Sequence, residues 1–254
     1  MKMEKIMINK IKSPRLNSPV MIVGLPGIGN VGKIAVEYLI DKLKMTKMID
    51  IITQYLPPQV FINEEGLIHL AKNSIYYKKR LKGGDLMVLT GDFQGTTQEG
   101  QYELCYKILQ IANDFKASAV YTLGGYSIGK IIDSPRVLGA VSDRTVLEWL
   151  KAADVLFPKG EPGGGIVGSA GLILGLATEV FGMHSACLMG ETSGYFADPK
   201  GATQILKSLR KLLSLEVDLS EIEERSKQIE EITGKMQEGM QQKPPGKEDL
   251  GYFG

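Results

Sequence analysis

Short apolar segments that end in glycines alternate along the chain with segments of helical spacing. Val20–Val23 runs into Gly24, and Asn30–Lys44 then carries apolar residues every three to four positions. A strand-like segment, a turn and a helix-like segment recur after three further apolar runs, which are Asp85–Thr90, Ala119–Leu123 and Ala186–Met189. Strands and helices that alternate in this way pack as a three-layer α/β/α domain with a largely parallel sheet. We predict this fold class.

Turn and capping residues place the remaining elements. We expect a strand at Met48–Thr53 and antiparallel hairpin structure in Val60–Tyr77, which Asn63-Glu-Glu-Gly66 interrupts. Asp198-Pro199 supplies an N-cap and a first-turn proline for a helix that ends near Leu213. The other expected helices are Gln98–Phe115, Ser142–Ala152 and a buried one in the uncharged stretch Pro162–Thr178.

Composition excludes several classes of protein. The 254 residues suffice for one large domain that folds without disulfides or metals. Lys and Arg number 30 and Asp and Glu 29, and the resulting net charge of +1 excludes nucleic-acid binding through overall basicity. Cys105 and Cys187 have no CxxC spacing, so we expect two reduced, buried thiols. With two histidines and no apolar stretch of membrane-spanning length, we expect a cytoplasmic protein with no metal, no cofactor and no membrane segment.

The glycine turn Gly27-Ile-Gly29-Asn-Val-Gly32 matches the dinucleotide fingerprint GxGxxG between a strand and a helix. Such a turn directs backbone N–H groups at an anion, so Gly27, Gly29 and Gly32 form a candidate anion-binding loop. Asp50 has roughly the right separation for the ribose ligand but starts the next strand instead of ending it. The alternative is that the three glycines only allow the strand and helix to pack closely.

Two other motifs each lack a decisive residue. Gly27–Lys33 and Gly124–Lys130 fit GxxxxGK, but isoleucine follows both lysines where a phosphate-binding loop needs Ser or Thr for magnesium. Gly125–Gly129 spells the nucleophile elbow GxSxG around Ser127, but an extended segment follows it instead of a helix. His184 is the one later histidine, and a structural role suits it better than that of a catalytic base.

The C-terminal region differs from the rest of the chain. Residues 216–238 hold eight acidic and three basic side chains, and a narrow apolar stripe that includes Leu219, Ile222, Ile229 and Met236 has helical spacing. We predict a core domain at 1–214 and an amphipathic helix at 215–240. The helix either folds back on its own domain or packs on another subunit of an oligomer.

Residues 241–254 are predicted to be a flexible tail. Gln241–Asp249 contains Pro244-Pro-Gly246 and charged residues, whereas the last five residues contain Tyr252 and Phe253. A flexible tail gains nothing from two aromatic side chains unless they bind a partner. We therefore take Tyr252, Phe253 and Gly254 as candidate partner-binding residues.

Five collinear blocks resemble the archaeal branch of the proteasome assembly chaperone family. They are GLPGIGNVGKIAVEYLI, GDFQGTTQEGQYEL, YTLGGYSIGK with SPRVLGAV, GGIVGSAGLILGLA, and CLMGET, and the resemblance covers Val20 to Leu213. It implies a fold similar to purine nucleoside phosphorylases but without a known catalytic role. It also implies homo-oligomers, for which we expect a pentamer, that bind proteasome α-subunits.

In this family and in proteasome activators, binding can use a C-terminal hydrophobic–Tyr–any-residue tail. The last three residues here fit this pattern in one of two ways: Phe253, which lacks the phenolic hydroxyl, replaces the tyrosine, or the motif is read one residue early. The sequence thus predicts a non-enzymatic, homo-oligomeric chaperone or adaptor that binds proteasome α-subunits or another client. Two alternatives remain: an enzyme that acts on a nucleotide or an ester at the glycine loops, and an oligomeric scaffold for a client other than the proteasome.

Overall fold

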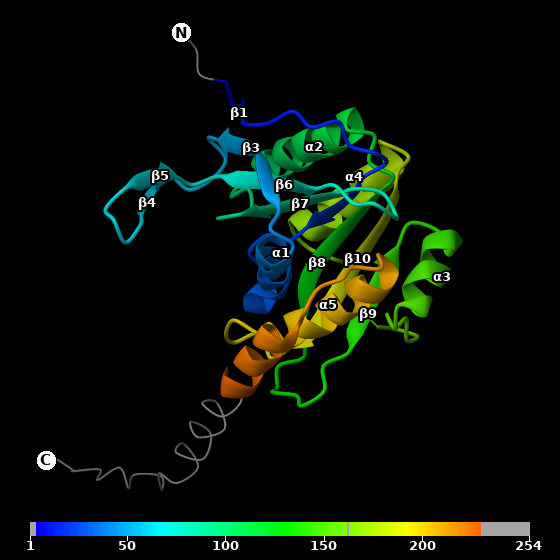
Figure 1. The fold of residues 1–254 in the computed structure, drawn as a ribbon. Coiled ribbons are helices and arrows are strands. Elements are labelled where there is room, and N and C mark those ends of the chain that lie inside the picture. Colours follow the sequence, from blue (N-terminus) through cyan, green and yellow to red (C-terminus); the bar gives the residue numbers. More distant parts are fainter. Residues whose placement is uncertain (1–3, 162, 230–254) are drawn as a thin grey trace, which may run out of the picture.

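An eight-stranded mixed sheet forms the centre of the domain. The computed structural model of the protein describes residues 4–161 and 163–229 (Figure 1). The sheet order is β1-β3-β6-β7-β2-β8-β10-β9. The strands are β1 Ile6–Lys10, β2 Val20–Val23, β3 Thr46–Thr53, β6 Asn73–Lys78, β7 Leu86–Gly91, β8 Ala119–Ser127, β9 Val137–Val141 and β10 His184–Thr192.

The parallel part of the sheet is its middle. β7, β2, β8 and β10 pair in parallel, whereas antiparallel pairs add β6, β3 and β1 on one side and β9 on the other. The predicted three-layer α/β/α class with a largely parallel sheet is confirmed, and its parallel strands are those at the centre of the sheet. The sequence analysis missed β1 and β9, which are outer strands; β1 lies in a basic segment and β9 follows Pro135.

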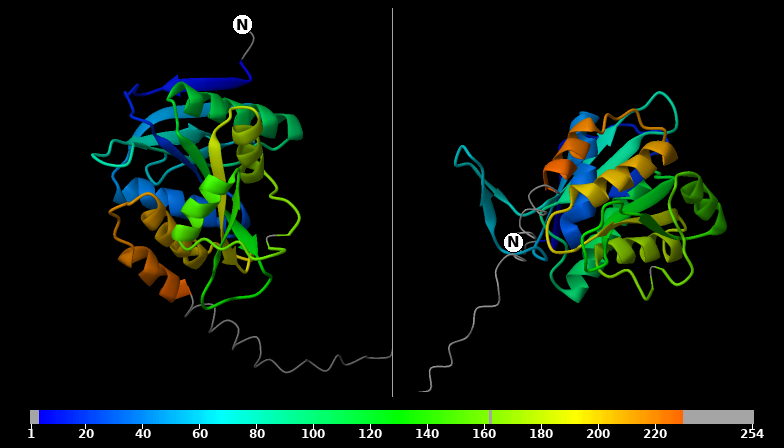
Figure 2. Two further views of the ribbon diagram at one scale, coloured as in Figure 1. Left: turned by 90° about the vertical axis from the view of Figure 1, so that its right-hand side faces the viewer. Right: turned by 90° about the horizontal axis from the view of Figure 1, so that it is seen from below.

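Helices cover both faces of the sheet, as the views in Figure 2 show. The helices are α1 Val31–Lys42, α2 Gln98–Asp114, α3 Arg144–Ala152, α4 Ser169–Glu179 and α5 Pro199–Leu212, with a 3-10 turn η1 at Ile28–Asn30. Strand residues alternate between two apolar clusters. In β2, Val20 and Ile22 pack with α1, α3 and α5, while Met21 and Val23 pack with α2 and α4. The protein therefore has three layers and two cores.

Capping side chains begin three of the helices. Asp198 accepts hydrogen bonds from the backbone N–H groups of residues 200 and 201, as its sequence position before Pro199 predicts. Thr97 and Asp143 cap α2 and α3 in the same way. The N-cap residue of α4 is Gly168, which has no side chain to cap the helix. Gln94, from the loop after β7, instead accepts a hydrogen bond from the N–H of Ser169 at 2.8 Å.

The segment after α5 folds back on its own domain. Leu215, Val217, Leu219 and Ile222 are buried in the cluster that contains α1 and α5. The Tyr38 hydroxyl donates to the Asp218 carbonyl at 2.8 Å, and Lys207 pairs with Glu223 at 2.8 Å. Residues 220–229 are helical. The described part of the predicted 215–240 helix thus folds back on its own domain, which is one of the two predicted alternatives. Its apolar stripe packs on α1 and α5.

A second, two-stranded sheet stands apart from the domain. β4 Val60–Ile62 and β5 Ile68–Leu70 form an antiparallel hairpin that projects to the side in Figures 1 and 2. The hairpin predicted within Val60–Tyr77 is confirmed, although the end of that segment joins the main sheet as β6. Cys105 and Cys187 are free and buried, as predicted. None of the helices in the described part of the chain has the length and apolarity to cross a membrane.

The buried position of Ile222 gives a test of the fold-back. Ile222→Ala should lower the free energy of unfolding by about 2–5 kcal/mol, the usual cost of truncating a buried isoleucine. Lys227→Ala, on the exposed side of the same helical segment, should change it by less than about 0.5 kcal/mol. Urea denaturation of both variants measures the difference. If Ile222→Ala altered the oligomeric state and left the stability unchanged, the segment would belong to a subunit interface instead.

Candidate functional site

The glycine turn after β2 lies beside the far end of β8. β2 pairs with β8 as far as Thr122, and beyond it β8 pairs with β10 alone up to Ser127. The glycine turn packs against the side of β8 that has no strand partner there, and the two backbones are in very close contact. A Cβ on Gly32 would lie 2.2 Å from the Leu123 carbonyl oxygen, and one on Gly125 would lie 2.2 Å from that of Ile28.

Gly29 has a second requirement besides space. Its φ of 59° lies in the left-handed region, and a Cβ there would lie 2.8 Å from Thr192 Oγ1. Gly29 and Gly32 thus bring the turn against β10 and β8. The geometry supports the close-packing interpretation of the fingerprint, and whether Gly27, Gly29 and Gly32 bind an anion stays a prediction.

The order of the strands in the sheet excludes Asp50 as the ribose-binding residue of a dinucleotide site. Asp50 lies in β3, which β6 and β7 separate from β2, so it cannot reach a ligand at the glycine turn. Burial opposes its ionisation, but hydrogen bonds from Ser74 and Lys72 outweigh this and hold the pKa of Asp50 below its usual value. Asp50 therefore anchors β3 to β6.

The lysine of the first GxxxxGK match is already engaged. Lys33 Nζ donates to the Gly91 carbonyl at 2.7 Å and pairs with Glu37 at 3.0 Å. These contacts connect α1 to the end of β7. The lysine of a phosphate-binding loop would instead have to point toward the glycine turn.

Ser127 does not form a nucleophile elbow. It is the last residue of β8, and its hydroxyl donates to the Ser193 carbonyl at 3.1 Å. His184 pairs with Ala119 at the opposite end of the strands, whereas Ser127 pairs with Thr192. At about 3.3 Å per residue, the two ends of β10 are roughly 26 Å apart, so His184 cannot serve Ser127 as a base.

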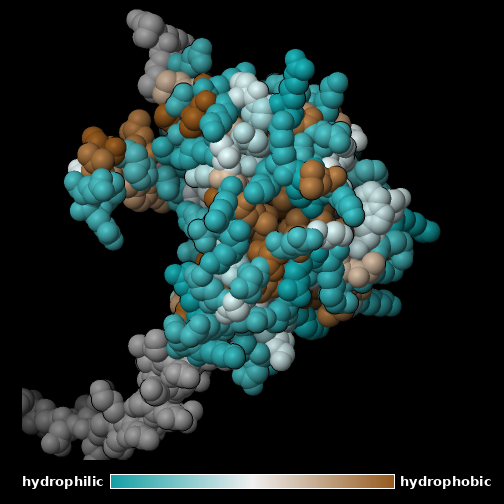
Figure 3. Space-filling view, viewed as in Figure 1, coloured by the Kyte–Doolittle hydropathy of each residue, from teal (hydrophilic) through white to brown (hydrophobic). Residues whose placement is uncertain are grey.

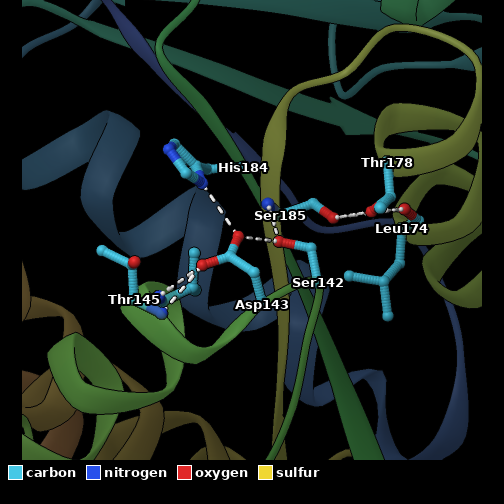
Figure 4. A network of polar contacts seen from close by, with 8 residues as sticks. Ser142, Asp143, Thr145, Leu174, Thr178, His184 and Ser185 are labelled. Atoms are coloured by element: carbon cyan, nitrogen blue, oxygen red, sulfur yellow. Dashed lines mark hydrogen bonds and ion pairs between the residues drawn. The ribbon is translucent and has the colours of Figure 1, made fainter.

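His184 belongs to a polar network that the sequence analysis did not find. Figure 4 shows Asp143 at its centre: one carboxylate oxygen accepts from Ser142 at 2.8 Å and lies 2.9 Å from His184 Nδ1. The other oxygen accepts from the N–H groups of Thr145 and Val146 at the start of α3. The hydrogen bonds, that of His184 first, hold the pKa of Asp143 well below its usual range.

This network resembles a Ser–His–Asp triad in composition but not in geometry. Ser142 and His184 both contact the same carboxylate oxygen, so the serine proton points at Asp143 and not at the imidazole. Ser142 also accepts from the Ser185 N–H at 3.0 Å, and Ser185 and Thr178 share a hydrogen bond at 2.8 Å. The network joins α3, β10 and α4.

A large groove opens between α4 and the strand ends. Its volume is about 1110 Å³, and it is lined by the turn after β2, the ends of β8 and β9, part of β10, residues 163–168 and one side of α4. The ionisable groups of its described lining are Glu161, Glu179 and the phenol and thiol of Tyr126 and Cys187, with no basic side chain. An anion in this groove would therefore meet no positively charged side chain and would depend on backbone N–H groups and neutral donors such as the Ser127 and Thr178 hydroxyls.

The rim of the groove is fixed by an ion pair. Burial opposes ionisation of Glu191, but hydrogen bonds from Arg136 outweigh it and lower the pKa of Glu191. Arg136 also reaches Glu161 at 3.0 Å. Arg136 thereby connects the ends of β9 and β10 to the loop at the mouth of the groove. Glu191 therefore has a structural role.

The residues predicted to contact other subunits or a partner do not line this groove. Leu219 and Ile222 are buried in the domain, and Ile229 lines a small hollow with Phe196 and Ile131. Met236 and the candidate binding residues Tyr252, Phe253 and Gly254 lie outside the described residues. Their roles stay predictions. Within residues 4–161 and 163–229, no three His, Cys, Asp or Glu side chains gather in a way that could hold a metal ion.

Comparisons with known proteins agree with one another. The family model described as the PAC2 family matches residues 21–237. The uncharacterized protein MJ1210 of Methanocaldococcus jannaschii is 37% identical over 260 residues, which cover 99% of each chain.

Two solved structures from Pyrococcus furiosus are also similar. PbaB, described as an archaeal proteasome activator, has a TM-score of 0.87 and 36% identity over 92% of this chain and 100% of that one. PbaA, described as an archaeal homolog of proteasome-assembly chaperone, has a TM-score of 0.75 and 27% identity over 92% of this chain and 93% of that one.

The close packing of Gly32 predicts opposite effects of the same substitution in two helices. Gly32→Ala should destabilise the protein by about 1–3 kcal/mol, because the new methyl group meets a backbone carbonyl that cannot move freely. Gly175→Ala, in open space on α4, should stabilise it by about 0.4–1 kcal/mol through lower entropy of the unfolded chain. Equal effects in urea denaturation would contradict the packing role.

The depressed pKa of Asp143 predicts a pH-dependent stability. Asp143→Asn keeps an oxygen that can cap α3 but loses the charge beside His184. A lowered folded-state pKa stabilises the native state above the unfolded value of 3.8, and this stabilisation is lost as the pH falls further.

The difference in unfolding free energy between the wild type and Asp143→Asn should thus have its greatest value at neutral pH and decrease as the pH falls below 3.8. Urea denaturation across a pH series measures it. Glu148→Gln, an exposed acid on the same helix, is the matched control and should show no such trend. A difference for Asp143→Asn that does not change with pH would contradict the assignment.

Proposed function

This chain belongs to the PAC2 family, as the resemblance of its sequence predicts, and we propose that it is a homo-oligomeric chaperone or adaptor that binds proteasome α-subunits. One observation carries the proposal: the similarity to PbaB extends over all of that chain at 36% identity, and PbaB is described as a proteasome activator. The proposal places the protein in the cytoplasm.

The polar groups of the strand ends support a binding protein over an enzyme. Lys33, Asp50 and Ser127 each have a structural partner, and His184 lies at the wrong end of the sheet for Ser127. A catalytic site needs a nucleophile and base within hydrogen-bond reach and a position for the reacting atom beside both. The candidate turns identified from the sequence do not offer this combination.

We assign the α-subunit contact to the tail residues Tyr252 and Phe253. The described chain leaves the domain from the helical residues 220–229 on the side of α1 and α5 (Figure 1). The predicted linker of residues 241–249 separates the aromatic pair from the domain by enough chain to reach a neighbouring protein. One short tail binds weakly because it loses conformational freedom on docking. Several tails on one oligomer, for which we propose a pentamer, would multiply the contact.

Removal of the tail end tests this assignment. Deletion of residues 250–254 should leave the fold and the oligomer intact and weaken binding to a purified archaeal 20S proteasome by at least about tenfold. Phe253→Ala should have a similar effect. Phe253→Tyr, which restores the phenolic hydroxyl of the family pattern, should tighten binding because it adds a hydrogen-bonding group. Surface plasmon resonance on immobilised proteasome measures all three.

Light scattering on the same samples serves as the control for the oligomer. If the deletion variant bound proteasomes as well as the wild type, the binding surface would lie on the folded domain. If neither bound assembled proteasomes nor isolated α-subunits, the proposal of a proteasome partner would be wrong.

A further inference from the structure

Two basic segments meet at the amino ends of the parallel strands. Residues 10–18, before β2, and residues 78–84, between β6 and β7, contain seven basic and no acidic side chains. The whole chain has a net charge of only +1, so positive charge is concentrated in these two segments. We call their exposed cations the basic edge, which consists of Lys10, Lys12, Arg15, Lys79 and Lys82.

A buried carboxylate holds the two segments together. One oxygen of Asp85 accepts from the Asn17 N–H at 2.7 Å, and the other accepts from the Arg80 N–H at 2.8 Å. The guanidinium of Arg80 turns back to donate to the carbonyls of Gly84 and Leu213, each at 2.6 Å. Asp85 and Arg80 therefore fix the backbone of the two segments, and their charges are used within the fold.

The basic edge extends across five strands of the sheet. The Lys12 N–H donates to the Met48 carbonyl of β3 at 3.1 Å, and the Val20 N–H of β2 donates to the Asp85 carbonyl at 2.9 Å. From β1 through β3, β6 and β7 to β2, four spacings of about 4.8 Å give a length of roughly 19 Å. The two segments come together at the upper right of Figure 1, where Figure 3 shows a largely hydrophilic surface with a few apolar groups.

The cations of the basic edge differ from most other basic residues in having no carboxylate partner. Elsewhere in the described chain, nine basic residues form ion pairs with carboxylates: Lys5, Lys33, Lys42, Lys47, Lys72, Arg136, Lys151, Lys207 and Lys211. Within residues 4–161 and 163–229, no ion pair involves a cation of the basic edge. A cluster of cations that no acid opposes attracts anions from outside the chain.

Two aliphatic side chains are exposed among these cations. Leu81, which precedes Lys82, is 104% exposed, and Ile11, between Lys10 and Lys12, is 47% exposed. A single exposed aliphatic residue is ordinary for a folded protein. Here both lie within a basic segment, so a ligand of the basic edge meets positive and apolar groups side by side.

This combination suits a peptide better than a nucleic acid or a membrane. Proteins that bind single-stranded nucleic acids stack bases on aromatic side chains. The exposed aromatic residues of the described chain lie outside both segments; they are Tyr102, Tyr106, Trp149 and Tyr195. Grooves of duplex DNA are read by a helix or a two-stranded ribbon, whereas these cations are mainly on loops. Attachment to a bilayer uses a broad apolar face, and the basic edge offers two aliphatic residues.

We propose that the basic edge binds an extended acidic segment of a client protein. Its length of roughly 19 Å corresponds to about six residues of extended chain at ~3.3 Å per residue. Carboxylates of the segment pair with the exposed cations, and aliphatic residues between them contact Ile11 and Leu81. The proposal rests on the proposed function in one respect, because it supplies the client side of an adaptor.

The basic edge and the tail lie at opposite ends of α5. Ile229, the last described residue, lines a small hollow with Pro199 at the start of α5. Leu213, directly after the end of α5, is the residue whose carbonyl binds Arg80. The 14 residues of α5 separate these two places by about 21 Å. The tail and the basic edge can therefore bind different partners without sharing a surface.

Charge reversal at the tip of the second segment tests the proposal. The full-length protein is titrated into a fluorescein-labelled, glutamate-rich peptide that contains two leucines, and fluorescence anisotropy gives the Kd. The double variant Lys79→Glu with Lys82→Glu should raise this Kd at least about tenfold, and added salt should weaken wild-type binding. Lys159→Glu with Lys227→Glu changes the net charge equally at exposed positions outside the basic edge and should leave the Kd unchanged. Circular dichroism checks that both variants fold.

Leu81→Ser separates a peptide ligand from a purely ionic one. It removes an aliphatic contact and no charge, so it should raise the Kd of the leucine-containing peptide by about threefold. The Kd of a peptide that contains only glutamate and serine should stay unchanged. Equal effects on the two peptides would contradict the aliphatic contact.

A single-stranded oligonucleotide and vesicles of phosphatidylglycerol in phosphatidylcholine are the competing ligands. The proposal requires that the wild type bind the peptide more tightly than either of them. Tighter binding to the oligonucleotide or to the vesicles would overturn it. Peptide binding that the variant Lys79→Glu with Lys82→Glu leaves unchanged would overturn it as well.

Proteasome binding keeps this proposal distinct from the proposed function. The variant Lys79→Glu with Lys82→Glu should bind proteasomes as the wild type does, and deletion of residues 250–254 should leave peptide binding intact. If the charge-reversal variant lost proteasome binding, the basic edge would contact the proteasome itself and the client proposal would be wrong. A wild type that binds the peptide at the basic edge but does not bind proteasomes supports the acidic-segment site and overturns the proposed function.

Discussion

The structure depends on a backbone-to-backbone contact between the turn after β2 and the far end of β8. Gly24, Gly32 and Gly125 each sit where a Cβ would lie 2.2 Å from a carbonyl oxygen of a neighbouring segment. Any side chain there would push α1 off the sheet. This contact allows α1 to pack on the parallel centre of the sheet. The buried residues of α1 in turn pack against α5 and residues 215–222.

The same contact explains why motifs of catalysis occur here without catalytic geometry. Tight strand-end turns require glycine, and glycines at short spacing imitate dinucleotide, phosphate and nucleophile motifs. In this protein the polar residues near them hold the fold: Lys33 binds the end of β7, and Arg136 with Glu191 connects β9 to β10. The groove beside α4 has carboxylates and no basic group in its described lining, which disfavours phosphate ligands.

The surfaces suited to partners lie outside this centre. One is the basic edge, which Asp85 holds at the amino ends of the parallel strands. The other is the C-terminal tail, which the sequence joins to the domain through a predicted linker. A family with a rigid core and peripheral binding elements can keep its fold while its partners change, because core packing and partner contacts use different residues.

The sequence by itself determined the α/β/α class, most of its elements and the cap at Asp198, because periodicity and capping act over a few residues. It did not reveal the outer strands β1 and β9. The glycine fingerprint left close packing and ligand binding open, since both need glycine. Only the tertiary structure decided that Asp50 lies in β3, beyond β6 and β7 from β2, and that His184 and Ser127 occupy opposite ends of neighbouring strands. It also decided that two basic segments far apart in the chain lie together. These facts depend on strand order and on contacts between residues far apart in the chain, which local patterns do not encode.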